Sequence, residues 1–163
     1  MSNSQSLRIP TPERGRPMPK MIFVNLAVAD VEKSAAFYEA VGFSRDQRFS
    51  RPGSAAAMNW YDTIVFMLLS REHFADFTSK TIIDARSSVE ALLCLSCDSR
   101  AEVDAIVGAA RVAGGKADPC PTQDYGFMYG RSFEDLDGHV FEPMWMDLDA
   151  ALAATGSQQT DAA

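Results

Sequence analysis

Residues 25–43, NLAVADVEKSAAFYEAVGF, contain the pattern that decides the fold. They continue an apolar run that starts at residue 21 and is rich in β-branched and aromatic residues, which predicts a strand. Asp30 then stands at a helix N-cap position, and Gly42 follows the helical stretch as a C-terminal stop. The stretch therefore predicts a strand that leads directly into a helix.

The same arrangement returns about 70 residues later. Residues 91–97, ALLCLSC, predict a second strand, and residues 98–115 predict a second helix. In that helix Ser99 and Glu102 have the spacing of a capping box. Short strand-like segments follow each helix, at residues 46–50, 56–61 and 63–69 and again at 116–118, 127–133 and 139–144.

The chain thus contains two copies of a β-α-β-β-β unit, and neither copy can bury its sheet face alone. We predict an α+β fold in which two tandem βαβββ modules, at about residues 21–80 and 89–147, form one cupped mixed sheet with the helices outside. A concave sheet lined by alternate side chains is a natural small-molecule pocket. A ferredoxin-like α+β sandwich has a similar element order and is the alternative.

Composition and charge indicate which part of the chain folds and which kinds of partner the protein is expected to lack. Residues 20–148 are predicted to be the folded domain, whereas 1–19 and 149–163 lack periodicity and are predicted to be flexible tails. The net charge of -7 argues against a nucleic-acid partner, because phosphate binding needs clustered Lys and Arg. The sequence shows neither a membrane span nor a secretory signal, so we expect no membrane partner and a cytoplasmic protein.

The three cysteines are Cys94, Cys97 and Cys120, an odd number. Cys94 and Cys97 form a C-x-x-C pair, but inside an apolar run rather than at a helix start. We predict buried, reduced thiols, with redox or zinc chemistry as the alternative.

The stretch at 25–43, taken with EDLDGHVFE at residues 134–142, resembles the vicinal oxygen chelate superfamily. This superfamily contains glyoxalase I, bleomycin-resistance proteins, fosfomycin-resistance enzymes and extradiol dioxygenases. The resemblance covers nearly all of residues 21–147, and segments 62–74 and 124–139 are similar to the bacterial group called predicted lactoylglutathione lyases. It implies the glyoxalase fold, which hosts both enzymes and binding proteins.

The resemblance also implies where a catalytic metal would be held, by one His or Glu from each of four strands. The matching positions are Phe23, Met67, Leu92 and Glu142, so only Glu142 keeps the ligand type. A thioether is too soft for the hard ions of this chemistry, and a hydrocarbon side chain cannot bind a metal. We therefore predict no metal and no other cofactor, with a divalent metal held through Glu142 as the alternative.

Glu142 is then the candidate catalytic residue. Among Phe23, Met67 and Leu92 its carboxyl group would be desolvated, which raises a carboxyl pKa and prepares a general base. Asn25 shares the face of Phe23 and would donate a hydrogen bond to an oxyanion. These residues suit a metal-free isomerase or lyase related to glyoxalase I. Alternatively, Glu142 is a structural carboxylate.

A binding protein of the bleomycin-resistance type is the competing hypothesis. Aromatic residues gather on the later strands of both modules, and the negative charge suits a cationic guest. Arg131 lies among apolar strand residues and is expected to meet Glu142, a substrate carboxylate or solvent. The resemblance further implies a homodimer, because cups in this fold are often completed between chains. The predicted ligand-binding residues are Phe23, Asn25, Trp60, Met67, Leu92, Tyr129 and Arg131.

Overall fold

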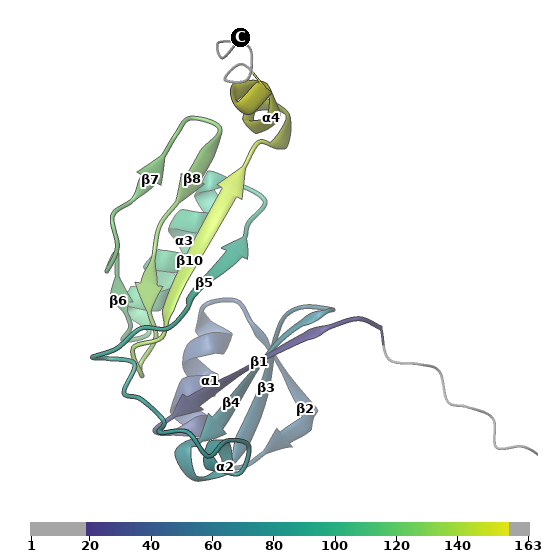
Figure 1. Ribbon diagram of the computed structural model, residues 1–163, viewed down its shortest axis with the longest axis vertical. Coiled ribbons are helices and arrows are strands. Elements are labelled where there is room, and N and C mark those ends of the chain that lie inside the picture. The colour runs from purple at the N-terminus through teal and green to yellow at the C-terminus, as the bar shows by residue number, and fades with distance from the viewer. Residues whose placement is uncertain (1–18, 157–163) are drawn as a thin grey trace, which may run out of the picture.

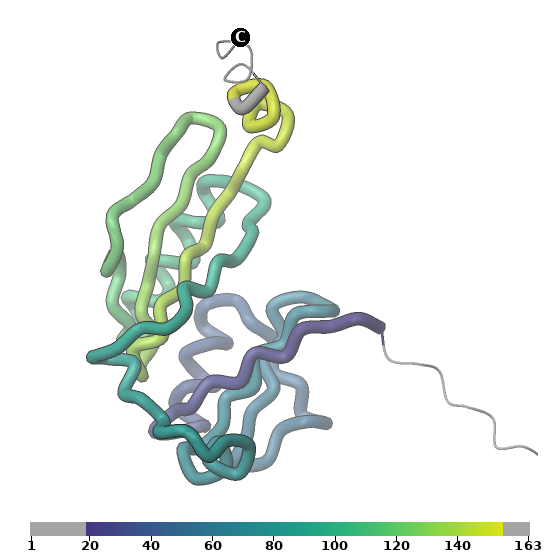
Figure 2. The backbone as a smooth tube through the Cα atoms, in the orientation of Figure 1, coloured from purple at the N-terminus to yellow at the C-terminus, as the bar shows by residue number. Residues whose placement is uncertain are grey.

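The computed structural model describes residues 19–156, so the predicted tail segments 1–18 and 157–163 lie outside the described residues. The first module (Figure 1) consists of β1 (Ile22–Val28), α1 (Val31–Ala40), β2 (Ser44–Arg51), β3 (Ala55–Tyr61) and β4 (Ile64–Ser70). A short helix, α2 (Arg71–Ala75), and a connection without regular structure lead to the second module, along the path that Figure 2 traces. The second module consists of β5 (Leu92–Ser96), α3 (Arg100–Val112), β6 (Lys116–Ala117), β7 (Gln123–Asp124), β8 (Met128–Gly130), β9 (Phe133–Glu134) and β10 (Val140–Met146).

Each module builds its own sheet. Sheet A has the strand order β1-β4-β3-β2, and β1 pairs with β4 in parallel. Sheet B has the order β6-β9-β10-β8-β7, and β5 pairs with β10, again in parallel. The predicted fold of two βαβββ modules is confirmed. Within residues 19–156, however, no strand pairing joins the two sheets, and β1 and β5 each have one strand partner.

The predicted helix ends are confirmed by their hydrogen bonds. The carboxylate of Asp30 accepts the N–H of Lys33 at 3.1 Å, and the hydroxyl of Ser99 accepts the N–H of Glu102 at 3.1 Å. The Glu102 carboxylate reaches back to the N–H of Asp98, at 2.6 Å. Both bonds at α3 satisfy donors that the helix itself leaves unpaired.

Residues 149–156, part of the segment predicted to be a C-terminal tail, lie in α4 (Leu148–Gly156) at the end of β10, as Figure 1 shows. Asp147 explains its start, because its side chain accepts the N–H of Ala150 at 3.0 Å. Most residues of this segment are alanines or leucines, which favour helix.

The helix-facing sides of the two sheets share a single hydrophobic core. The Phe141 ring of sheet B lies 5.4 Å from Phe66 of sheet A and 5.7 Å from Tyr38 of α1, between ring centroids. Gly115 has no room for a side chain, since a Cβ there would lie 2.5 Å from the Glu134 carbonyl oxygen and 2.8 Å from the Phe37 ring of α1. The modules therefore pack through their helix-facing sides. The opposite side of each sheet, here called its open face, carries the candidate site.

Candidate functional site

The open face of sheet A forms the floor of a cavity of about 890 Å³. Because side chains alternate along a strand, Leu26 and Phe66 point into the core, whereas Phe23, Asn25 and Met67 point to the cavity. Asn25 lies directly beside Met67 in the parallel pairing of β1 with β4. Three of the predicted ligand-binding residues therefore lie together.

Small side chains give this cavity its depth. Ala55 and Ala57 of β3 are buried on its floor, next to the apolar side chains of Val65 and Leu69. Aromatic rings surround the opening: Phe23 from β1, Phe49 from β2, and His73 and Phe77 from α2 and the segment after it. Among the residues that the structure describes, 19–156, those that line the cavity lie between positions 21 and 77, in the first module and the segment that follows it.

The polar groups of the cavity differ in whether they already have a partner. The amide side chains of Asn25 and Asn59 line it, and within residues 19–156 neither makes a hydrogen bond. Asp46 and Arg48 also line it, but they bind each other at 2.7 Å. The site thus has an apolar floor with two amides that are free to bind a ligand.

Glu142 and Leu92 lie on the other sheet. On β10, Phe141 and Pro143 are buried on the helix-facing side, so Glu142 projects from the open face of sheet B. Its direct neighbour across the β5–β10 pair is Cys94, and Leu92 lies two residues before that cysteine. Burial, and then the charge of Glu142, raise the pKa of the Cys94 thiol.

The predicted grouping of Glu142 with Phe23 and Met67 is therefore not found within one chain. The cavity around Phe23 and Met67 has no lining residue beyond position 77. The physical reason is the packing mode, because the sheets meet through their helix-facing sides and not edge to edge.

Trp60 does not point into the cavity. Its neighbour Asn59 lines the cavity, so alternation turns Trp60 toward the core, where its ring lies 5.1 Å from that of Phe43 between centroids. Trp60 packs against the core and does not line the cavity of sheet A, so it is separated from Phe23, Asn25 and Met67, with which it was grouped.

Tyr129 and Arg131 also turn away from the open face, toward α3. The Tyr129 hydroxyl donates to Asp104 of α3 at 2.9 Å, and Arg131 donates to the same carboxylate at 2.8 Å. Arg131 further binds Asp118 through two hydrogen bonds, at 3.0 and 2.7 Å. The hydrogen bonds that Arg131 donates to Asp118 and then to Asp104 raise the pKa of its guanidinium above the ordinary value. Arg131 thus binds Asp104 and Asp118 and not Glu142.

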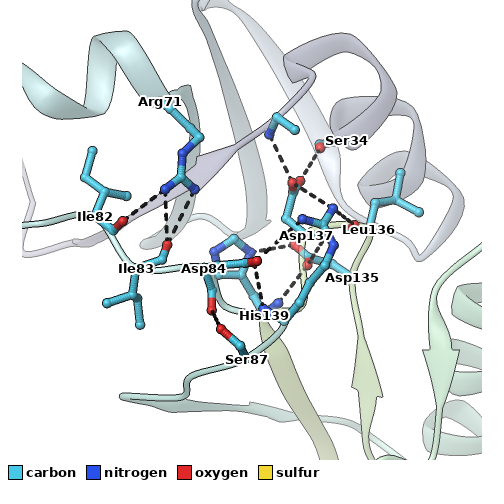
Figure 3. Close-up of polar contacts among 12 residues, drawn as sticks. Ser34, Arg71, Ile82, Ile83, Asp84, Ser87, Asp135, Leu136, Asp137 and His139 are labelled. Atoms are coloured by element: carbon cyan, nitrogen blue, oxygen red, sulfur yellow. Dashed lines mark hydrogen bonds and ion pairs between the residues drawn. The ribbon is translucent and has the colours of Figure 1, made fainter.

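Sequence reasoning missed the role of the turn between β9 and β10. Figure 3 shows Asp137 of this turn next to Ser34, near the start of α1. Asp137 accepts the N–H of Ala29 at 3.0 Å and the hydroxyl of Ser34 at 3.2 Å. The Arg86 guanidinium, from the connection between the modules, lies 3.5 Å from the same carboxylate.

Asp135 makes the second link in this turn. It accepts the Tyr38 hydroxyl at 2.7 Å, and its carboxylate lies 2.9 Å from Nδ1 of His139. Burial alone raises a carboxyl pKa, but hydrogen bonds from His139 and Tyr38 and the charge of His139 bring the pKa of Asp135 below its ordinary value. We call Asp135, Asp137 and His139, with Tyr38 and Ser34, the inter-module clasp. The signal that could have revealed it is the density of acidic residues in the turn sequence EDLDGH, residues 134–139.

The side chains at the four implied metal positions do not fit a divalent metal. Phe23 and Leu92 have no donor atom, Met67 offers a soft thioether, and Glu142 alone supplies a hard oxygen. The histidines do not complete the set, because His139 binds Asp135 in the clasp and His73 lies 3.3 Å from Asp76. Among residues 19–156, no three His, Cys, Asp or Glu side chains come together in a way that could hold a metal ion.

The three cysteines are free, but their burial differs from the prediction. Cys94 is exposed on the open face of sheet B, whereas Cys97 and Cys120 are half-buried. Burial raises the pKa of Cys97 to about 11, so this thiol stays protonated and weakly nucleophilic at neutral pH. The helices of the described residues include none long and apolar enough to span a membrane.

Comparison with known proteins places these features in a family context. The family model described as Glyoxalase/Bleomycin resistance protein/Dioxygenase superfamily matches residues 20–142. No curated protein matches the chain. The solved structure of hypothetical protein SA1046 from S. aureus is similar at 30% identity, with a TM-score of 0.65, covering 79% of this chain and 95% of that one.

Two further solved structures share the fold. A glyoxalase/bleomycin resistance protein/dioxygenase family enzyme from Burkholderia phytofirmans PsJN is 22% identical, with a TM-score of 0.64, covering 79% of this chain and 100% of that one. A lactoylglutathione lyase from Agrobacterium tumefaciens is 16% identical, with a TM-score of 0.56, covering 80% of this chain and 96% of that one.

Proposed function

Because this chain belongs to the Glyoxalase/Bleomycin resistance protein/Dioxygenase superfamily, whose members bind small molecules, we propose that it binds a small organic molecule in the cavity of sheet A, without a metal ion. The observation that supports this most directly is the cavity itself, whose volume of about 890 Å³ is that of a ligand pocket. Its apolar floor and two free amides can hold and orient a ligand. The four implied metal positions include a single hard donor, Glu142, so binding must rely on contacts with the protein.

We further propose that the protein is a homodimer in which a second copy covers this cavity. Three large apolar side chains next to the open faces remain exposed in one chain: Ile22 by 55%, Phe23 by 45% and Leu92 by 51%. The edge strands β1 and β5 also have one partner each, and such edges favour pairing with another chain. A dimer that brings sheet B of one chain over sheet A of the other would bury both features.

That dimer supports a second candidate function, a metal-free isomerase or lyase of the lactoylglutathione lyase type. Glu142 projects from the open face of sheet B, so in such a dimer the partner subunit's Glu142 would reach the side of the cavity that carries Asn25 and Met67. A carboxylate enclosed there would act as a general base, and the Asn25 amide would stabilise the oxyanion. Within one chain Glu142 contributes nothing to the cavity lining, so we rank this function second.

Methionine-methyl NMR tests the binding proposal, because the methionines report on different places. Met67 lines the cavity, Met58 is buried in the core, and Met144 lies on the open face of sheet B. We expect a library of small organic fragments to include compounds that shift the Met67 methyl signal and leave Met58 unmoved, with assignment by Met67→Leu. If fragments shift Met144 but none shifts Met67, the cavity of sheet A is not the binding site. No shift in either signal contradicts the proposed function as a whole.

A further inference from the structure

The charges around the cavity of sheet A are balanced. Four residues with permanent charge line it, the acidic Asp46 and Asp62 and the basic Arg48 and Arg51. Asp46 and Arg48 neutralise each other at 2.7 Å, so the Arg48 guanidinium is already occupied. Arg51 is exposed, at the end of β2. The cavity therefore offers a charged ligand group no buried partner, and burying an unpaired charge is costly.

The walls of the cavity favour a flat, apolar ligand. The buried floor consists of Ala55, Ala57, Val65 and Leu69, with Met67 beside them. The two alanines leave room for a ring system, and the polarisable thioether of Met67 makes favourable contacts with aromatic rings. The aromatic side chains of Phe23, Phe49 and Phe77 stand at the opening, where they can cover a ring from above.

The other polar groups of the lining are Ser50, His73 and two neutral amides. The Ser50 hydroxyl donates to the Asp46 carbonyl oxygen at 2.7 Å and accepts the N–H of Ala57, and His73 lies 3.3 Å from Asp76. Asn25 lies on β1 and Asn59 on β3, and within the described part of the chain both amides lack a partner. Each amide offers both a donor and an acceptor. A neutral group such as a hydroxyl or an amide satisfies them, whereas an ionised carboxylate satisfies only the donors.

We infer that the ligand of this cavity is an uncharged aromatic molecule that carries a neutral hydrogen-bonding group. This inference rests on the proposed binding function and states the ligand class more closely. It separates the cavity from sites built for peptide conjugates with several carboxylates, because the lining contains no pair of unoccupied cationic groups.

Two fluorescent probes with the same aromatic skeleton test the charge requirement. N-phenyl-1-naphthylamine is neutral, and 8-anilinonaphthalene-1-sulfonate adds a single anionic group. S-hexylglutathione serves as the charged peptide conjugate and competes against the neutral probe. We expect the neutral probe to bind at least about tenfold more tightly than the sulfonate, and S-hexylglutathione to displace it poorly.

A matched pair of variants tests whether the neutral probe binds in the cavity of sheet A. Ala57→Phe fills the floor of the cavity and should weaken the binding of the neutral probe at least about tenfold. Ala36→Phe makes the same change at an exposed position of α1 and should leave binding unchanged. Circular dichroism and the thermal midpoint confirm that both variants fold.

The outcomes separate the ligand class from the function. Sulfonate or S-hexylglutathione binding that is equal or tighter, and lost in Ala57→Phe, overturns the inference but leaves the binding function intact. Binding of the neutral probe that survives Ala57→Phe also overturns the inference, because the probe then lies elsewhere. If none of the three compounds binds in a way that Ala57→Phe abolishes, and no fragment shifts Met67, the proposed function fails with the inference.

Discussion

The hydroxyl of Tyr38 on α1 donates a 2.7 Å hydrogen bond to the carboxylate of Asp135, in the turn that leads to β10. Both groups are buried, and they belong to different modules. Tyr38 also packs edge-on against Phe141, with ring centroids 5.7 Å apart. One side chain thus joins the shared core to the inter-module clasp, which explains why the two sheets hold one relative position in the chain.

Removing that hydroxyl should destabilise the whole domain. In Tyr38→Phe the ring remains, but the buried Asp135 carboxylate loses a donor, and such a change costs about 1–3 kcal/mol. Urea denaturation followed by circular dichroism measures the loss in the free energy of unfolding. Tyr61→Phe, at an exposed tyrosine, is the matched control and should change it by less than about 0.5 kcal/mol. Equal effects of the two substitutions would show that the hydrogen bond contributes nothing.

The clasp also predicts how stability depends on pH. The folded-state pKa of Asp135 lies below the ordinary value of 3.8, chiefly through His139 once burial is overcome. Its contribution is therefore present above that value and is lost as the pH falls through 3.8 toward the folded pKa. Asp135→Asn should be less stable than the parent at pH 7, and the difference should narrow below about pH 4. Unfolding free energies at several pH values test this, and a difference that does not depend on pH would contradict it.

The substitution Glu142→Gln distinguishes an enzyme from a binding protein. If Glu142 is a general base, Glu142→Gln should lower turnover of an α-ketoaldehyde–thiol adduct by about a hundredfold or more. The unfolding free energy should stay unchanged, since within residues 19–156 the Glu142 side chain has no hydrogen-bond partner to lose. Glu39→Gln, on the exposed side of α1, controls for the loss of one negative charge. Turnover that both variants retain at the parent rate excludes Glu142 as the base.

The dimer proposal predicts that a charged residue on the open face of sheet B prevents dimer formation. Leu92→Asp places a charge on an exposed apolar residue that the proposed dimer buries, so the dimer should dissociate. Val112→Asp changes a more exposed apolar residue at the end of α3 and should leave the assembly intact. Light scattering coupled to size-exclusion chromatography measures the mass of each. A parent protein that elutes as a monomer at micromolar concentration would refute the proposed dimer directly.

Much of the fold could be predicted because its signals are local. The Asp30 and Ser99 caps are read from single side chains next to apolar helical patterns, and both form as expected. The alternation along β1 correctly placed Phe23 and Asn25 on one face. Alternation also explains the position of Trp60, because its neighbour Asn59 lines the cavity. Trp60 was grouped with Phe23 and Asn25 by its aromatic residue type and not by its place in the strand.

Arg131 shows where such reasoning stops. An arginine among apolar strand residues needs an acidic partner, and the sequence offered many acidic residues. The two that bind it, Asp104 and Asp118, come from α3 and from the loop after β6. Those segments lie near Arg131 because α3 packs against sheet B. No local sequence pattern predicts that contact.

The sequence by itself determined the two modules, the starts of their helices and the faces of β1, because these follow from capping residues and from periods of two or 3.6 residues. Only the tertiary structure decided that the modules pack through their helix-facing sides, which places Glu142 on a different sheet from Phe23 and Met67. That packing depends on the fit among Tyr38, Phe66 and Phe141 and on the buried bonds of Asp135 and Asp137. Contacts between segments so distant in the chain are set by shape and burial, which sequence periodicity does not encode.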